Sequence, residues 1–133
     1  MKAKIIVLLL LTGVGLGPLA WAKAIEPTPL TVVTYKGEEI PVYDVKDVRP
    51  KSFEQPRYPD EARDLRAEGQ AIIVVVVDTS GKVIEADIKE SKPTAAFGVA
   101  AQKAVRQWRY PKLTRNGQPT KFILQQVIMF EIQ

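Results

Sequence analysis

The apolar positions of the chain fall into short extended runs separated by turns that contain glycine or proline. The strongest run, residues 70–78, holds six consecutive β-branched residues, which is typical of a central strand covered on both faces. A tight turn with Gly81 at a position of positive φ leads into residues 83–90, where apolar and charged residues alternate. Residues 121–133 form a last predicted strand, with apolar residues on both of its faces.

Two helices are predicted in the same region of the chain. Tyr58-Pro59 is expected to open a short helix, because proline is preorganised for the first helical position and the acidic residues that follow suit the helix dipole. Gly69 is expected to end this helix in a left-handed conformation. A second helix is predicted after Thr94 or a neighbour as its cap, since apolar residues recur along residues 97–108 at steps of three and four.

An amino-terminal β-hairpin is predicted upstream of these elements. Residues 30–35 and 40–45 are extended runs of β-branched and aromatic residues, and residues 36–39 can form the turn between them. Pro41 lacks a backbone amide, so its strand is expected at an edge. The charged, proline-flanked residues 47–56 are interpreted as a connector.

The predicted fold class is α+β, with two short helices packed on a small antiparallel sheet. From Tyr58 onward the order is helix, strand, strand, helix, strand. The expected organisation is an export segment at residues 1–22, an extended or hairpin lead-in and connector at residues 23–52, and one domain at residues 53–133.

Residues 1–22 have the pattern of a secretory signal peptide. A positive start precedes an apolar run at residues 5–11, and Ala20 and Ala22 are the small residues that a signal peptidase reads. Cleavage after Ala22 predicts an exported protein. The alternative is a retained single anchor in the inner membrane, which requires counting the glycine-rich part toward the roughly 20 residues of a span.

The composition argues against catalysis. The chain has no cysteine and no histidine, which excludes lipoprotein attachment, disulfides, thiol catalysis and thiolate metal sites. Lys2 and Lys4 supply two of the formal net charge of +4, so the rest of the chain lacks the charge excess of a nucleic-acid-binding protein. Ser80 and Lys82 are close in sequence, but an exposed turn explains them better than a catalytic pair. We expect no enzyme activity, cofactor or metal.

Residues 103–121 contain basic residues and no acid. A solvated helix face and loop explain this run, because cations are favoured at helix carboxyl ends. The functional alternative is a steering patch for an acidic protein or an anionic cell-wall polymer. The basic residues are Lys103, Arg106, Arg109, Lys112, Arg115 and Lys121.

The last strand has an edge of particular interest. If residues 70–78 are central, residues 121–133 pair with them on the side opposite residues 83–90, and the other side of the last strand is left unpaired. Neither proline nor lysine blunts it between residues 122 and 130. Either the amino-terminal hairpin or a dimer partner covers this edge, or it docks an extended peptide by strand addition. The sequence also leaves open which face is buried, that of Leu124, Ile128 and Phe130 or that of Ile123, Val127 and Met129.

Residues 53–133 resemble the carboxy-terminal domain of the TonB family. The resemblance depends on the order and spacing of several short motifs, each of them weak alone. These motifs are Gln55-Pro56-Arg57-Tyr58-Pro59, Glu68-Gly69-Gln70, Gly81-Lys82-Val83, Ser91-Lys92-Pro93 and Ala104-Val105-Arg106-Gln107-Trp108-Arg109-Tyr110.

The resemblance implies that the exported chain resides in the periplasm of a Gram-negative cell. It also implies that the chain binds an extended peptide of an envelope protein, such as an outer-membrane transporter. In the family this peptide adds as a strand to the last strand of the sheet, and a glutamine before the Pro-x-Tyr-Pro motif also contacts it. The corresponding residues here are Gln55 and, along the last strand, Gln126, Val127, Ile128, Met129, Phe130, Glu131 and Ile132. Tyr58, Trp108 and Tyr110 are expected to pack in the core.

Two departures from the family weaken the expectation of force transmission. Family transducers have an anchor with a histidine, which this chain lacks, and a long proline-rich spacer. Here only residues 23–54 precede the domain, and these 32 residues span at most about 110 Å when fully extended. The resulting hypotheses are a peptide-binding module, a short energy transducer with a retained anchor, and a self-associating structural protein of the envelope.

Overall fold

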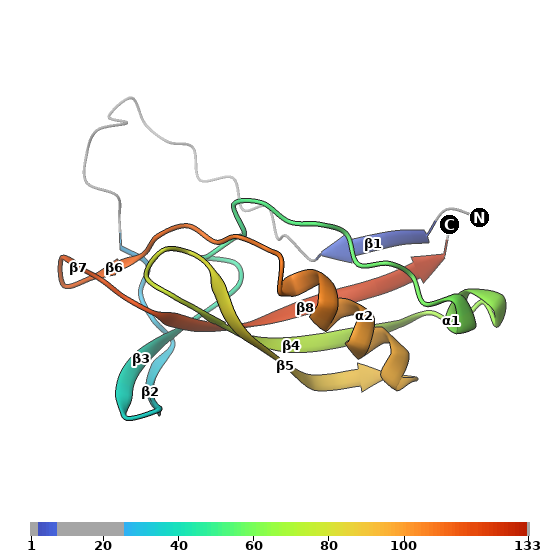
Figure 1. The fold of residues 1–133 in the computed structure, drawn as a ribbon, viewed down its shortest axis with the longest axis horizontal. Coiled ribbons are helices and arrows are strands. Elements are labelled where there is room, and N and C mark those ends of the chain that lie inside the picture. Colours follow the sequence, from blue (N-terminus) through green and yellow to red (C-terminus); the bar gives the residue numbers. More distant parts are fainter. Residues whose placement is uncertain (1–2, 8–25, 133) are drawn as a thin grey trace.

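The computed structural model describes residues 3–7 and 26–132 (Figure 1). Its elements, in chain order, are β1 (Ala3–Val7), β2 (Thr31–Tyr35), β3 (Glu38–Tyr43), α1 (Asp60–Asp64), β4 (Gly69–Val77), β5 (Val83–Lys92), α2 (Ala95–Val105), β6 (Thr114–Arg115), β7 (Gln118–Pro119) and β8 (Phe122–Ile132). The order from α1 onward confirms the prediction apart from the small β6–β7 hairpin. No helix among the described residues is long and apolar enough to span a membrane.

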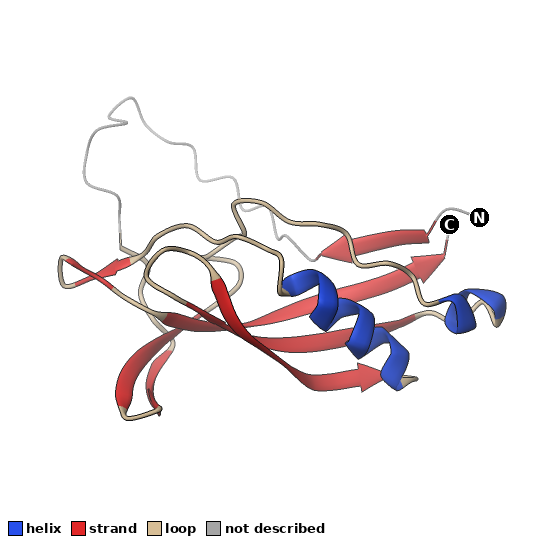
Figure 2. Ribbon diagram, viewed as in Figure 1, coloured by secondary structure: helices blue, strands red, loops and turns tan. Residues whose placement is uncertain are grey.

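The principal sheet has the strand order β2-β3-β8-β4-β5, and β1 pairs with β8 on the same side as β3. The predicted central strand is β4, which pairs antiparallel with β5 on one side and with β8 on the other. Both helices lie on one face of this sheet (Figure 2). The predicted α+β class is therefore confirmed.

The main core lies between the helices and this face of the sheet. Tyr58, Trp108 and Tyr110 are all buried, as expected of packing residues. The rings of Tyr58 and Phe130 pack edge-on with their centroids 5.7 Å apart, an arrangement that aromatic pairs prefer. In β8 the even-numbered residues Phe122 to Phe130 are buried, so Leu124, Ile128 and Phe130 form the core face and the ambiguity left by the sequence is resolved.

The amino-terminal hairpin forms as predicted, from β2 and β3. The expectation that Pro41 places its strand at an edge is wrong, because β3 lies between β2 and β8. The proline is tolerated because β3 pairs with β8 only through Val42 and Tyr43, beyond Pro41. On the sheet face away from the helices, Ile40 packs in a second cluster with Val76 and Ile123.

The first helix differs from the prediction at both ends. Pro59 is the residue before the first helical turn, one position earlier than expected. Gly69 does not end the helix in a left-handed conformation, since the positive φ of 52° belongs to Arg66. Gly69 begins β4, and a Cβ there would lie 2.0 Å from the carbonyl oxygen of Lys92. Its role is therefore close approach of two backbones.

A small hairpin, β6–β7, lies between α2 and β8, where no strand was predicted. Asn116 and Gly117 form its turn with φ values of 53° and 76°, the left-handed pair that a two-residue hairpin turn requires. The carboxylate of Glu26 accepts hydrogen bonds from the Thr114 hydroxyl at 2.8 Å and from the Asn116 and Gly117 amides at 3.2 Å. The second described stretch of the chain thus begins, at residue 26, attached to this turn.

Candidate functional site

The candidate site is the outer edge of β8, defined as the backbone of residues 125–132 on the side away from β4. The prediction of an unpaired edge is wrong over part of this length. Just before it, β3 pairs in parallel with Ile123 and Leu124. At the carboxyl end, β1 pairs antiparallel with residues 128–132, in the register Val7 to Ile128 and Ala3 to Ile132 (Figure 1).

The direction of the backbone groups along this edge follows from one hydrogen bond. The amide of Ile132 donates to the Glu68 carboxylate at 3.0 Å, and Glu68 immediately precedes β4. Successive amides in a strand point in opposite directions within the sheet. The amides of Val127, Met129 and Glu131 therefore face the outer edge, and those of even-numbered residues face β4.

A short gap separates the two strands that cover this edge. Among the described strands, β3 reaches β8 only as far as Leu124 and β1 begins at Ile128. Val127 and the side chain of Gln125 lie between these limits, and Gln125 is exposed whereas Val127 is half-buried.

Three of the residues predicted along the docking strand have their side chains in the core. Gln126, Ile128 and Phe130 are each at most 2% exposed. The side-chain oxygen of Gln126 accepts a hydrogen bond from the Tyr110 hydroxyl at 3.3 Å. Burial raises the pKa of Tyr110, which keeps the hydroxyl protonated as a donor. The side chains of these residues attach β8 to the core, whereas the outward-facing backbone amides of the edge belong to its odd-numbered residues.

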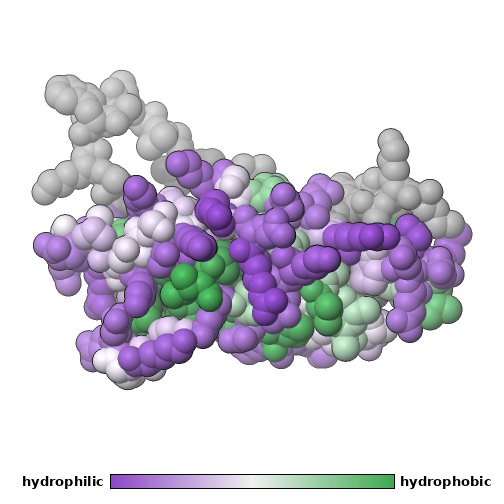
Figure 3. Space-filling model, viewed as in Figure 1, coloured by the Kyte–Doolittle hydropathy of each residue, from purple (hydrophilic) through white to green (hydrophobic). Residues whose placement is uncertain are grey.

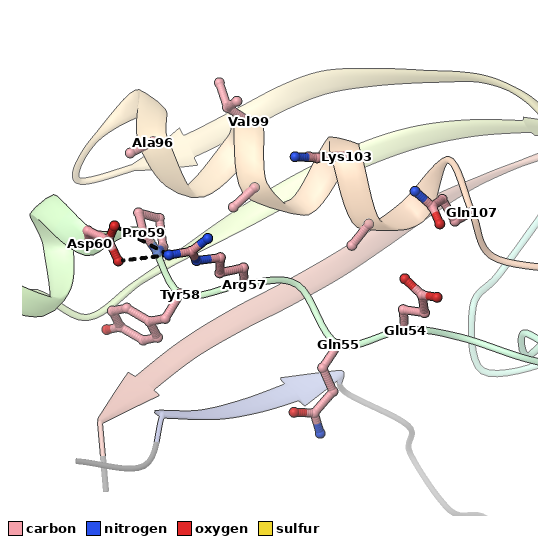
Figure 4. Close-up of a pocket in the computed structure, with 12 residues that line it drawn as sticks. Glu54, Gln55, Arg57, Tyr58, Pro59, Asp60, Ala96, Val99, Lys103 and Gln107 are labelled. Carbon is pink, nitrogen blue, oxygen red and sulfur yellow. Dashed lines mark hydrogen bonds and ion pairs between the residues drawn. The ribbon is translucent and has the colours of Figure 1, made fainter.

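Gln55 is exposed and lies on an extended segment that crosses over β8. In Figure 4 its side chain points away from α2, toward the end of β1. The backbone on either side is fixed, because the Trp108 indole donates to the Glu54 carbonyl at 2.9 Å and the Tyr58 hydroxyl donates to the Ala67 carbonyl. The segment that carries Gln55 is therefore held in place on both sides of this residue.

A groove of about 480 Å³ lies on the other side of the same segment, against α2 (Figure 4). Small apolar residues of the helix form its floor, and Val99 is 57% exposed at its rim. An ion pair of 3.4 Å between Arg57 and Asp60 stands at one end. Figure 3 shows that apolar patches interrupt the hydrophilic surface on this face of the molecule.

The predicted basic run is divided among different parts of the surface. Lys103 lines the groove beside α2, whereas Arg109 and Lys112 line a separate hollow with Lys51. Lys121 is paired with Glu38 of the hairpin at 3.2 Å. The steering role remains a prediction.

Ser80 and Lys82, which raised the catalytic alternative, belong to the hydrogen-bonded turn between β4 and β5. Asp78 accepts hydrogen bonds from the Ser80 hydroxyl at 2.6 Å and from the Lys82 amide at 2.9 Å. Glu85 forms an ion pair with Lys36 at 2.9 Å, which ties the hairpin turn to β5. No group of three or more potential ligands is placed to hold a metal ion within the described part of the chain.

Comparison with known proteins decides the family. A family model described as the Gram-negative bacterial TonB protein C-terminal matches residues 54–132, which is more than half of the chain. The chain belongs to the TonB carboxy-terminal domain family. The matched region of this TonB-family chain includes both Gln55 and β8, whereas β1, β2 and β3 precede it.

Curated relatives are similar over the same region. Protein TonB of Xanthomonas campestris pv. campestris (strain B100) is 32% identical over 72 residues, covering 54% of this chain and 32% of the relative. Protein TonB of Escherichia coli (strain K12) is 39% identical over 62 residues, covering 47% of this chain and 26% of the relative. The similarity thus spans about a third or less of these longer proteins.

A solved structure agrees on the fold. The solution NMR structure of the Pseudomonas aeruginosa TonB CTD aligns with a TM-score of 0.57 at 21% identity, covering 68% of this chain and 93% of that one. Of the amino-terminal strands, only β1 was not expected. The hairpin pattern predicted β2 and β3, whereas the apolar run that overlaps β1 indicated an export segment.

Proposed function

We propose that this TonB-family chain is a periplasmic binding module that docks an extended segment of an envelope protein on the outer edge of β8. Strand addition would use the outward backbone groups of Val127, Met129 and Glu131, with Gln55 as a side-chain contact. An outer-membrane transporter is the proposed partner class, and TonB-dependent transport, as of siderophores, is the process it would serve.

The observation that carries this proposal is the pairing of β1 with residues 128–132. A strand with no place in the matched family region pairs there through five consecutive register positions. Main-chain hydrogen bonds supply the affinity in strand addition, whatever the sequence of the added strand. The same backbone groups are therefore suited to a foreign strand of similar length.

The hairpin supports a defined length for the docked segment. Because β3 pairs with Ile123 and Leu124, an added strand can extend only from Gln125 to the end of β8. This stretch of eight residues is of ordinary strand length.

Val127→Pro tests the docking edge. Proline removes an outward amide and opposes strand addition, while the amides that face β4 are retained. We expect capture of envelope proteins to fall at least about tenfold. This is the effect of losing one hydrogen bond and of fitting the docked strand poorly around the proline. Val127→Ala is the matched control, because it keeps the amide and should bind nearly normally, and Gln55→Ala should cause a smaller loss.

Photocrosslinking in intact envelopes identifies the partner. A benzophenone amino acid at Gln125, beside the gap, is expected to capture an extended segment of an outer-membrane protein. The same probe at Ile84, which is 44% exposed on the strand at the far edge, is the control. Undiminished capture by a folded Val127→Pro chain would exclude docking along β8.

The short energy transducer with a retained anchor remains a second proposal, which the family membership supports. The mass of the mature protein separates the two, because a chain that begins at Lys23 has lost the anchor.

A further inference from the structure

The amino-terminal strand lies on the same backbone groups that a docked peptide would use. Ile6 is the register partner of Met129, and Lys4 that of Glu131. Because the amides of Met129 and Glu131 face outward, those of Ile6 and Lys4 face β8 in return. The amide of Ile5, between them, faces away from the sheet.

The outer edge of β8 can be occupied by β1 or by a partner strand, but not by both at once. Neighbouring strands lie about 4.8 Å apart in a sheet, and β8 has only one side that does not belong to β4. Each outward amide of residues 128–132 can therefore pair with β1 or with a foreign strand at one time.

The segment that contains β1 can leave without dismantling the domain. Glu26 is held by Thr114, Asn116 and Gly117 at the β6–β7 turn, so the chain beyond the proposed cleavage site has its own attachment. The structure that matches the fold, from Pseudomonas aeruginosa, is itself a separate carboxy-terminal domain.

We propose that β1 is an autoinhibitory strand, which blocks the outer edge of β8 in any chain that retains its amino terminus. Removal of residues 1–22, or displacement of β1, exposes Met129 and Glu131 and permits docking. This inference rests on the proposed docking function. It assigns to the amino-terminal segment a role in keeping the unprocessed chain from binding envelope proteins or other copies of itself.

Amide hydrogen exchange in the full chain tests the contact. The protein is made by cell-free synthesis with an intact amino terminus, verified by mass. Ile6→Pro removes an amide that faces β8, so exchange at Met129 and Glu131 is expected to accelerate by about tenfold or more. Ile5→Pro is the matched control, because its amide faces away, and it should leave exchange unchanged. Phe130, whose amide faces β4, is the internal reference.

Peptide binding tests the inhibition. The probe is a fluorescein-labelled peptide with the sequence Lys-Ala-Lys-Ile-Ile-Val, that of residues 2–7. Anisotropy titration is expected to show at least about tenfold tighter binding to the Ile6→Pro chain than to the unmodified or Ile5→Pro chain.

The outcomes separate the two proposals. Equal binding of the probe to all three chains overturns autoinhibition and leaves docking intact. Absence of binding to every chain, with exchange at Met129 accelerated in Ile6→Pro, overturns docking on this edge and the inhibitory role with it. Unchanged exchange in Ile6→Pro shows that β1 does not cover the edge and overturns the inference directly.

Discussion

Gln126 and Tyr110 form a polar contact inside the aromatic core, directly beneath the candidate edge. Their side chains are 2% exposed, and the Tyr110 hydroxyl donates to the Gln126 amide oxygen at 3.3 Å. A buried polar group that loses its partner is costly, whereas replacing both partners with apolar groups costs less. This contact fixes which face of β8 turns inward and therefore which amides turn outward.

Tyr110→Phe is expected to lower the free energy of unfolding by about 1–2 kcal/mol, because the Gln126 side chain is left unpaired. Combining Tyr110→Phe with Gln126→Leu should cost less than the sum of the two single changes. Urea denaturation of the unmodified chain, the two single variants and the double variant measures this coupling. Strictly additive changes in the free energy of unfolding would show that the two side chains do not interact.

Asp78 is the acid-sensitive residue of the β4–β5 turn. The Ser80 hydroxyl, followed by the turn amides, lowers its pKa in the folded state below the ordinary value of 3.8. A lowered folded-state pKa stabilises the protein above that ordinary value, and the stabilisation is lost as the pH falls through the folded-state pKa.

Asp78→Asn is therefore expected to destabilise the protein at pH 7, by about 1 kcal/mol for the weakened hydrogen bonds of the turn. The difference between the two proteins should shrink as the pH falls well below the ordinary value of 3.8, because the carboxyl of the unmodified chain then becomes protonated. Urea midpoints at pH 7 and across the acid range measure this difference, with the exposed Asp87→Asn as the control. A difference that grows toward low pH would contradict the prediction.

At the scale of elements, the β2–β3 hairpin owes its position to a small apolar contact on the open face of the sheet. Ile40 is 1% exposed in its cluster with Val76 and Ile123, and the Lys36–Glu85 ion pair adds a surface contact. Exposed ion pairs contribute little, whereas a buried isoleucine contributes several-fold more. The apolar contact is therefore what attaches the hairpin.

Ile40→Ala is expected to lower stability by about 2–4 kcal/mol and to loosen the hairpin first. Amide exchange at Val42 and Tyr43 should accelerate more than exchange within β4. Val33→Ala, at a residue 36% exposed in β2, is the control for truncation on the hairpin and should have little effect. Uniform acceleration across the whole sheet would show that the hairpin does not open independently.

The elements of the domain were predictable because local patterns specify them. The β-branched run of β4, the alternation in β5 and the helical stripe of α2 each match the period of the element formed. The short β6–β7 hairpin was missed despite Asn116-Gly117, because its two-residue strands offer no alternation to recognise. Gly69 was assigned to the wrong role, because close approach to Lys92 depends on a partner 23 positions away in sequence.

The strand that carries the candidate site was predicted in position, but the pairing along its outer edge was not. Sequence patterns located β8 and suggested that its second edge is available, since those properties follow from strand order. They could not show that residues 3–7 lie on this edge, because an apolar run of that kind satisfies export, membrane insertion and strand pairing equally well. Nor could they show that the side chain of Gln126 is buried whereas that of its neighbour Val127 is not, because this depends on which face of the strand turns toward the core.

At the scale of the whole molecule, β1 covers part of a sheet edge. A long uncovered edge strand is a template for pairing with another chain. With β1 in place, the outward backbone groups of residues 128–132 pair within the same molecule. Loss of β1 leaves an open stretch at one end of the sheet, which a second copy could cover.

The full-length Ile6→Pro chain is expected to self-associate with rising concentration, whereas Ile5→Pro stays at the oligomeric state of the unmodified chain. Sedimentation velocity over a hundredfold dilution range measures this difference. Adding Met129→Pro to the Ile6→Pro chain should reverse the association, because it removes an outward amide from the edge. Association that persists in the double variant would place the contact elsewhere.

The attachment of Glu26 beside the β6–β7 turn determines how the domain would carry tension. Figure 1 shows this turn and the carboxyl end of β8 at opposite ends of the long axis. A pull on the chain ahead of Glu26, resisted by a peptide held along residues 125–132, would run lengthwise down the strands. Inter-strand hydrogen bonds lie across that direction, so they would share the load in shear instead of opening one after another. The same geometry would let a weakly bound strand resist pulling for longer than its affinity alone suggests.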